Sequence, residues 1–260
     1  MKYQNDLRAS VAASLSAGGI DLFEHLPYIL QDLWAMGVSP EVVIELIKRH
    51  QVLDTCSKVV DLGCGKGAAA ITIAKEFGCQ VAGIDGMPDF IETAKSKSVE
   101  FGISELCSFV CADVRERIEK LKNFDLAVWG SVGSIFGSVE ATLKALAGCL
   151  KPQGFLIYDD GYIREGREIT LPLYIKRTEL LKVIASTGFK IWEERKYDAE
   201  YIMYTETEMQ KPIIQRCQEL MQKIPQKKEL FRQYITNQER EWREMEEDME
   251  CVTFLLQRSR

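Results

Sequence analysis

The feature that most constrains the fold of this chain is a regular alternation between residues 58 and 160, in which short apolar runs are separated by segments of helical periodicity. The apolar runs predict strands at 58–62, 80–85, 107–113, 124–130 and 154–160, and the segments between them predict helices at 67–77, 88–102 and 138–151. Because the apolar runs lack alternating polar residues, they indicate a parallel sheet that is covered on both faces. Right-handed crossovers between such strands produce a doubly wound α/β sheet.

The residues outside this alternation predict added helices and two more strands. Residues 178–189 and 199–250 have helical patterns, and residues 190–197 and 251–257 read as strands. We therefore expect a mostly parallel seven-stranded sheet. The expected organisation is an N-terminal helical cap (1–50), an α/β core (51–198), a helical insertion or lid (199–250) and the last strand of the core sheet (251–260).

Charge and composition narrow the class of protein. The 260 residues carry a net charge of −6, which disfavours a nucleic-acid partner. The sequence has no apolar run of membrane-spanning length and no apolar signal core at its N-terminus, so we expect a cytoplasmic protein without a membrane partner. Its eight cysteines form no Cys-x-x-Cys pair, and its two histidines lie upstream of all of them, so no metal site is expected.

A glycine-rich turn follows the first predicted strand. Gly63 and Gly65 alternate with other residues after Asp61, in the stretch "DLGCGKG". Such a turn between a strand and a helix lets a ligand lie against bare backbone. Asp85 ends the second strand, where a carboxylate can accept hydrogen bonds from both hydroxyls of a ribose, and Asp113 ends the third, beside the base. The pattern therefore predicts a site for an adenosine-bearing cofactor.

Two classes of cofactor fit this turn. The stretch "GCGKGA" at residues 63–68 matches the dinucleotide fingerprint G-x-G-x-x-G/A, which predicts a nicotinamide-dependent oxidoreductase. S-adenosylmethionine carries a sulfonium and an ammonium but no phosphate. Asp61 suits such a cationic ligand, whereas an acid would be unfavourable beside a pyrophosphate.

The wider set of motifs resembles the class I S-adenosylmethionine-dependent methyltransferases, and most closely their small-molecule branch. The resemblance covers roughly residues 55–195 and the last strand near 251–257. The matching stretches, in family order and spacing, are "VVDLGCGKG", "VAGIDGMPDFIETAK", "FVCADV", "FDLAVWGS" and "LKPQGFLIYDD". The resemblance implies the Rossmann-like fold of that family.

The resemblance also implies a set of cofactor contacts. Asp61 would hold the amino group of the methionine end, with Gly130 offering its carbonyl to the same ammonium. Asp85 would bind the ribose diol, while Met87 flanks the adenine and Asp113 accepts from its exocyclic amine. The full implied set is Asp61, Gly63, Cys64, Gly65, Asp85, Gly86, Met87, Asp113, Val114 and Gly130.

The catalytic residues are less constrained, because methyl transfer from a sulfonium is an in-line displacement that depends on alignment and exclusion of water. A general base is needed only when the acceptor must lose a proton. Asp159 and Asp160 end the fifth strand, and we predict that one of them, with Tyr162, orients or deprotonates the acceptor. The alternative is that both aspartates cap the turn at Gly161.

The acceptor pocket is expected to be covered by Tyr28 and Trp34, although ordinary helix packing is an equal alternative for both. The chain has "WGSV" after its fourth strand, where methyltransferases of nucleobase or amide nitrogens usually carry Asn/Asp-Pro-Pro-aromatic, so a small-molecule acceptor is favoured. We expect a monomer or homodimer. Two alternatives remain open: an NAD(P)-dependent oxidoreductase and a catalytically silent S-adenosylmethionine-binding module.

Overall fold

The chain divides into an α/β unit and a helical unit. The computed structural model describes residues 2–167 and 174–259. The α/β unit contains Ala35–Lys196 and Cys251–Arg260, and the helical unit contains the residues up to Trp34 together with Tyr197–Glu250. Residues 35–50, which the sequence analysis placed in the N-terminal cap, lie in the α/β unit, where helix α3 (Pro40–His50) packs on helix α4 (Ala68–Phe77).

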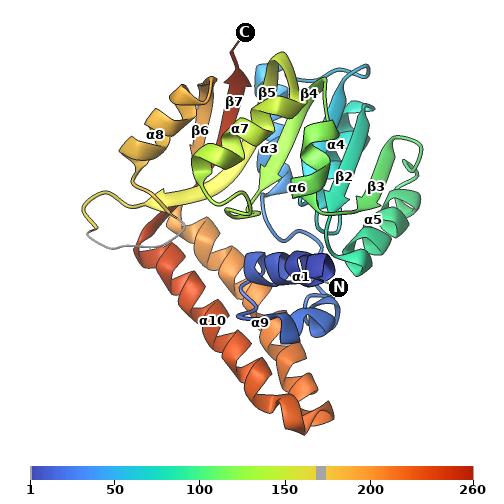
Figure 1. The fold of residues 1–260 in the computed structure, drawn as a ribbon, viewed down its shortest axis with the longest axis vertical. Helices are drawn as coiled ribbons and strands as arrows, with labels where there is room; N and C mark the ends of the chain where they lie inside the picture. Colours follow the sequence, from blue (N-terminus) through green and yellow to red (C-terminus); the bar gives the residue numbers. More distant parts are fainter. Residues whose placement is uncertain (1, 168–173, 260) are drawn as a thin grey trace. The chain divides into compact units, whose positions relative to one another are not determined.

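The α/β unit is built on one seven-stranded sheet (Figure 1). Its strands are β1 (Lys58–Leu62), β2 (Gln80–Asp85), β3 (Cys107–Cys111), β4 (Phe124–Gly130), β5 (Leu150–Ile163), β6 (Phe189–Lys196) and β7 (Met249–Arg258). The strand order is β3-β2-β1-β4-β5-β7-β6. Strands β1 to β5 pair in parallel, and β6 pairs antiparallel with β7. The predicted doubly wound, mostly parallel sheet is confirmed.

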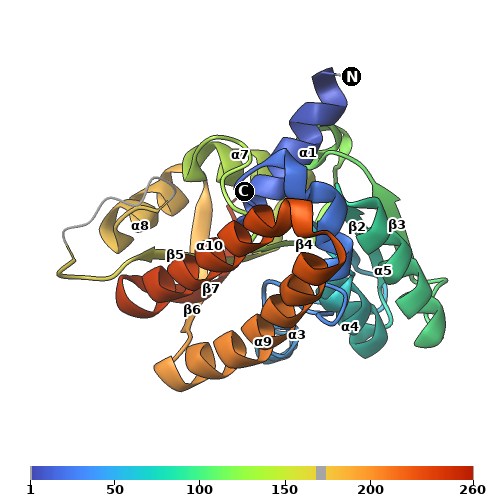
Figure 2. The same ribbon diagram turned by 90° about the horizontal axis from the view of Figure 1, so that it is seen from below.

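Helices cover both faces of this sheet. Helices α3, α4 and α5 (Pro88–Glu100) lie on one face, and helices α7 (Val139–Cys149) and α8 (Arg177–Ser186) lie on the other (Figure 1, Figure 2). The short helices α6 (Val114–Arg117) and η2 (Ile118–Lys120) pack beside α7. The second face buries Trp129, Leu146, Tyr158 and Ile184 among its core residues, so burial on both sides explains the continuous apolar strands.

Local sequence sets where these helices begin and end. Ser39 accepts a hydrogen bond from the backbone nitrogen of Val42, and Pro40 opens α3. Helix α4 begins after Gly67 and ends at Gly78 in the left-handed conformation. The helix predicted to end at 151 stops instead at Cys149, because Pro152 disfavours helical backbone in the residue before it. Strand β5 therefore begins at Leu150. It also continues to Ile163, so Asp159 and Asp160 lie within the strand and not at its end, where the sequence pattern placed them.

The helical unit contains helices α1 (Lys2–Ser14), η1 (Ile20–His25), α2 (Leu26–Ile29), α9 (Ala199–Lys223), η3 (Pro225–Lys227) and α10 (Lys228–Glu247). Helices α9 and α10 pack against each other, while η1 contacts α1, α2 and α10. Phe231 and Tyr234 of α10 are buried in this unit. The Ser16 hydroxyl also donates to the carboxylate of Glu241, a half-buried residue whose pKa is raised by loss of solvent.

Candidate functional site

The glycines of the turn after β1 differ in what surrounds them: some are required for packing, and one, Gly65, is less closely covered. Gly63, Gly65 and Gly67 all adopt positive φ values, of 75°, 52° and 78°. A Cβ atom on Gly63 would lie 2.5 Å from a methyl group of Val132, whereas a Cβ on Gly65 would meet nothing closer than Met36 Cε at 3.5 Å. Gly63 is therefore needed for packing within the protein, and Gly65 leaves backbone accessible to a ligand.

Asp85, at the end of β2, connects this turn to the next loop. Its Oδ2 accepts a hydrogen bond from the backbone nitrogen of Gly65 at 2.8 Å, and its Oδ1 accepts from Met87 at 2.8 Å. Burial raises the pKa of this carboxyl, and the backbone donors act in the opposite direction. Since each carboxylate oxygen can accept more than one hydrogen bond, Asp85 keeps capacity for ligand hydroxyls.

Asp61 is a buried acid two residues before Gly63, the first glycine of the turn. Its side chain is 3% exposed. Burial, followed by repulsion from the charge of Asp85, raises the pKa of the Asp61 carboxyl to about 7, against a lowering by the backbone nitrogen of Ala70. Two neighbouring carboxyls with raised pKa values lie at the carboxyl ends of β1 and β2, an arrangement typical of sites that receive a cationic or hydroxyl-bearing ligand.

Cys64, Gly86 and Met87 line the same pair of loops. Cys64 is buried, and loss of solvent raises the pKa of its thiol well above the usual range, so it is a packing residue rather than a thiolate. The backbone oxygen of Gly86 lies 3.8 Å from the sulfur of Cys111. Met87 is fully buried and precedes α5, which opens with Pro88.

Asp113 lies just beyond β3, which ends at Cys111 rather than at 113. Its Oδ1 accepts from the backbone nitrogen of Arg115 at 2.8 Å, so Asp113 caps α6, followed by the buried Val114. Both of its oxygens also accept from the guanidinium of Arg115. Asp113 therefore has a capping role in the structure, and any contact with an adenine amine would share a carboxylate already paired with Arg115.

Gly130 ends β4 and is closely covered. A Cβ on Gly130 would lie 2.6 Å from Val38, and a Cβ on Gly37 would lie 2.8 Å from the Gly130 carbonyl oxygen. Segment 36–38 thus lies along the carboxyl edge of the sheet, with Met36 nearest Gly65 and Val38 against Gly130. Sequence reasoning missed these residues because only Gly37 in this short stretch marks a close backbone approach.

Asp159 and Asp160 point in opposite directions, as adjacent strand residues do. Asp159 is 5% exposed and accepts hydrogen bonds from the hydroxyls of Ser131, at 2.7 Å, and Thr253, at 2.5 Å. Asp160 accepts from the Tyr158 hydroxyl and from the backbone nitrogen of Gly161, each at 2.8 Å. Burial raises the pKa of Asp160 to about 6.

Tyr162 lies two residues beyond Asp160 on the same strand. Its hydroxyl donates to Glu194 Oε1 at 2.9 Å, and Glu194 also pairs with the Arg177 guanidinium. The hydrogen bond from Arg177 lowers the pKa of Glu194, and burial raises the pKa of Tyr162. The tyrosine is therefore held by β6 and α8, while the hydroxyl nearest Asp160 belongs to Tyr158.

Tyr28 and Trp34 belong to the helical unit. The Tyr28 hydroxyl donates to Glu219 and accepts from Lys223 Nζ at 2.7 Å, and the guanidinium of Arg216 lies 5.7 Å from its ring centre. Tyr28 thus joins α2 to α9, in the manner of the packing alternative. Trp34 is the half-buried last residue of its segment.

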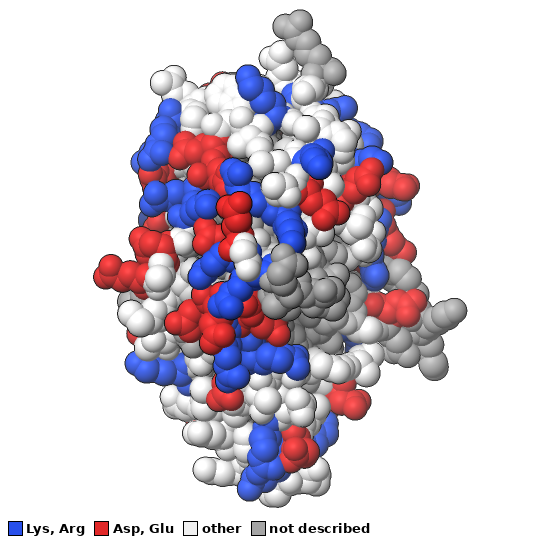
Figure 3. Space-filling view, turned by 90° about the vertical axis from the view of Figure 1, so that its left-hand side faces the viewer, with Lys and Arg blue, Asp and Glu red and all other residues white. Residues whose placement is uncertain are grey.

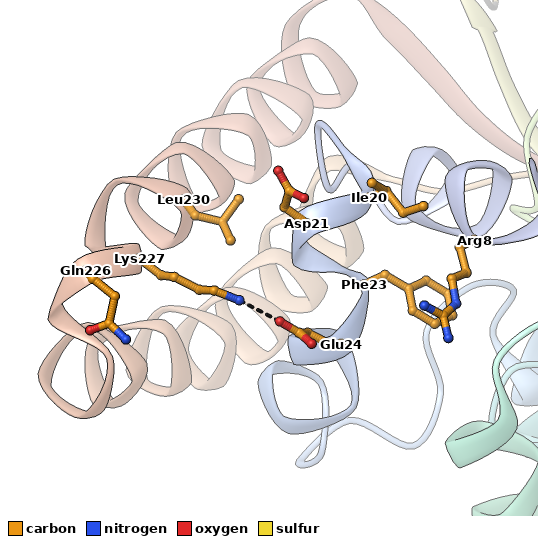
Figure 4. Close-up of a pocket in the computed structure, with 8 residues that line it drawn as sticks. All are labelled: Arg8, Ile20, Asp21, Phe23, Glu24, Gln226, Lys227 and Leu230. Atoms are coloured by element: carbon orange, nitrogen blue, oxygen red, sulfur yellow. Dashed lines mark hydrogen bonds and ion pairs between the residues drawn. The ribbon is translucent and has the colours of Figure 1, made fainter. Parts of the chain in front are cut away.

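A pocket of about 460 Å³ lies elsewhere in the helical unit (Figure 4). It is lined by Arg8, Ile20, Asp21, Phe23, Glu24, Gln226, Lys227 and Leu230. Lys227 reaches across it to pair with Glu24 at 2.5 Å. None of the residues predicted from the sequence to bind cofactor or acceptor lines this pocket.

The match to known families agrees with this geometry. Residues 59–154 match the model of a family described as a methyltransferase domain. This part of the chain is therefore similar to a methyltransferase domain. The predicted resemblance to S-adenosylmethionine-dependent methyltransferases and its Rossmann-like fold are confirmed. The matched residues run from β1 to the beginning of β5 and include the glycine turn, Asp85 and Gly130.

Individual relatives extend the comparison. The domain is 31% identical over 101 residues to sterol 4-C-methyltransferase strm-1 of Caenorhabditis elegans, covering 38% of this chain and 30% of that protein. It is 30% identical over 109 residues to the uncharacterized protein YjhP of Escherichia coli, covering 42% and 44% of the two chains. The matched region thus spans less than half the length of either curated relative.

Solved structures share the fold over more of the chain. A methyltransferase from Geobacter sulfurreducens in complex with S-adenosyl-L-homocysteine aligns with a TM-score of 0.76 at 19% identity, covering 90% of this chain and 97% of that one. The structure of E. coli YjhP aligns with a TM-score of 0.71 at 18% identity, covering 90% and 100%. At these identities the likeness concerns the fold around the methyltransferase domain.

The rest of the surface adds little that is specific. Acidic and basic side chains are interspersed on the face shown in Figure 3. Among residues 2–167 and 174–259, no three His, Cys, Asp or Glu side chains are grouped so as to hold a metal ion. Within the same described ranges, no helix has the length and apolar character needed to cross a bilayer.

Proposed function

We propose that the protein is an S-adenosylmethionine-dependent methyltransferase that acts on a small-molecule acceptor. The observation that carries the proposal is the pairing of Asp61 and Asp85 around the open backbone of Gly65. A cofactor with an ammonium at one end and a ribose diol in the middle requires two carboxylates along a bare turn. When bound, S-adenosylmethionine supplies an electrophilic methyl group on a sulfonium.

The residues of the chain have distinct tasks in this proposal. Asp61 would pair with the ammonium of the cofactor, whose positive charge would favour the ionised form of this carboxyl and release of its proton to solvent. Asp85 accepts from the ribose hydroxyls while it holds Gly65 and Met87 through their backbone nitrogens. The Gly130 carbonyl, at the end of β4, accepts from the ammonium. Their joint effect is to orient the sulfonium for in-line displacement.

A small-molecule acceptor is supported by the charge of the chain and by relatives. A second relative, after the sterol methyltransferase, is aklanonic acid methyltransferase DauC of a Streptomyces strain. The domain is 32% identical to it over 121 residues, and the match covers 54% of that protein. The net charge of −6 and the interspersed charges of Figure 3 offer no continuous basic surface on the face shown for a nucleic acid.

Of the two adjacent acids of β5, Asp159 and Asp160, the geometry favours Asp160 as the group that orients or deprotonates the acceptor. Both Asp159 oxygens accept from protein hydroxyls, whereas among the described residues the side-chain hydrogen bond of Asp160 comes from Tyr158. A carboxyl with a pKa of about 6 is suited to take a proton near neutral pH. We expect Asp160→Asn to lower turnover about a hundredfold, with cofactor affinity near the wild-type value. Full turnover in this variant would leave catalysis to alignment alone.

The proposal is tested by calorimetry with S-adenosylhomocysteine and with NAD, using the full chain. Binding of the first and not the second is expected, and the reverse result would restore the oxidoreductase alternative. Formation of S-adenosylhomocysteine from S-adenosylmethionine in the presence of a metabolite extract then distinguishes an enzyme from a silent binding module. Cofactor binding without product formation in any fraction of the extract would favour the binding module.

A further inference from the structure

The loop after β4 is tied to two other strands by one buried carboxylate. Ser131 directly follows Gly130 and has a φ of 56°, in the left-handed region that non-glycine residues seldom adopt. Its hydroxyl donates to Asp159 Oδ1 at 2.7 Å, and its backbone nitrogen donates to the Asp159 carbonyl oxygen at 3.0 Å. The second carboxylate oxygen accepts from Thr253 Oγ1 at 2.5 Å. Asp159, which lies within β5, therefore joins this strand to the residue after β4 and to the middle of β7.

This arrangement is built rather than incidental. Asp159 is 5% exposed and Thr253 is fully buried, so the carboxylate accepts hydrogen bonds from protein hydroxyls in place of water. Two hydrogen bonds from the same residue, one to side chain and one to backbone, restrain Ser131 in a conformation that is costly by itself. Gly130, whose register partner on β5 is Asp159, is thereby held together with Ser131.

We propose that Asp159 is a positioning residue which, through Ser131 and Thr253, sets the direction of the Gly130 carbonyl toward the amino-acid end of the cofactor. The inference rests on the proposed function, in which that carbonyl receives the cofactor ammonium. Asp159 acts without touching the cofactor. The sequence alone predicts that either Asp159 or Asp160 acts on the acceptor. In this proposal Asp160 acts on the acceptor, and Asp159 orients the carbonyl that binds the cofactor.

The test compares two ligands that differ only at the end in question. S-adenosylhomocysteine carries the amino-acid moiety, and 5′-methylthioadenosine lacks it while retaining the adenosine and the sulfur. Calorimetry on the full chain should show that Asp159→Ala weakens S-adenosylhomocysteine about tenfold and leaves 5′-methylthioadenosine within about twofold. Ser131→Ala should produce the same selective loss, and the double variant should lose little more than either single one, because both remove the same link.

Three comparisons keep the experiment decisive. Thr253→Val removes the second hydroxyl donor to Asp159 with almost no change in volume and should give a smaller loss of the same kind, even if Asp159→Ala does not fold. Thr142→Val removes a buried hydroxyl from α7, on the opposite face of the sheet, and should change neither affinity. Asp61→Asn is the positive control for selective loss of S-adenosylhomocysteine.

The outcomes are distinguishable. Equal weakening of both ligands by the Asp159 and Ser131 variants, or no weakening of either, overturns the positioning role and leaves Asp159 as a structural residue. A wild-type chain that binds neither ligand overturns the proposed function itself, whereas a wild type that binds both ligands alike shows that the amino-acid end is not recognised, which also overturns this inference.

Discussion

Replacing Asp61 by asparagine should make the empty protein more stable and the cofactor site weaker. Asp61 is buried, and its carboxyl has a pKa of about 7, raised first by loss of solvent and then by the charge of Asp85. Above that pH the folded protein must hold two neighbouring negative charges at the ends of β1 and β2. Asparagine keeps the shape and an oxygen that can accept from Ala70, but it never ionises.

The sign and size of the effect follow from linkage. An acid whose pKa is raised in the folded state binds more protons when folded than when unfolded, so stability falls as pH rises between the two values. For Asp61 this window runs from its ordinary value of 3.8 to about 7. With about 1.4 kcal/mol per pKa unit, the ionised side chain costs the folded state at most about 4 kcal/mol above pH 7. The asparagine variant should recover part of this at pH 8 and much less at pH 4.5, near the lower end of the window.

Urea unfolding of both proteins at pH 4.5 and pH 8 measures the difference directly. Calorimetry with S-adenosylhomocysteine should show wild-type affinity rising with pH through about 7 as Asp61 ionises and meets the ligand's ammonium, and no such rise in the variant. A variant that is less stable than the wild type at pH 8, or equally shifted at both pH values, would refute the argument that burial of charge dominates at this position.

Substitutions at other positions lead to further predictions. Asp85→Ala should remove measurable binding of S-adenosylhomocysteine and, by leaving the Gly65 and Met87 nitrogens without their acceptor, lower the free energy of unfolding by about 2 kcal/mol or more; unchanged affinity in calorimetry would exclude Asp85 from the site. Gly65→Val should block the same ligand, whereas Gly102→Val, a matched glycine with φ of 69° in open space, should cost stability but not binding. Tyr28→Phe should lower the free energy of unfolding by about 1 kcal/mol through loss of its contacts to Glu219 and Lys223, and an unchanged urea midpoint would show that the link between α2 and α9 carries no stability.

Local patterns in the sequence determined much of this protein. Continuous apolar runs predict strands that are buried on both faces, and glycines and prolines predict where the intervening helices begin and end. The same local reasoning located Asp61, Gly65 and Asp85, because topology alone brings the carboxyl ends of neighbouring parallel strands to one edge of a sheet. Periodicity also predicted that Asp159 and Asp160 face opposite ways.

Only the tertiary structure decided which role each side chain takes, because that depends on partners far away in the chain. Thr253 lies 94 residues from Asp159, and nothing in either local sequence indicates their contact. Val132, packed against Gly63, makes that glycine a packing requirement, while the neighbouring Gly65 stays open. A motif specifies which residue types stand at the sheet edge. The side chains that arrive from other strands decide which of those residues remain available to a ligand.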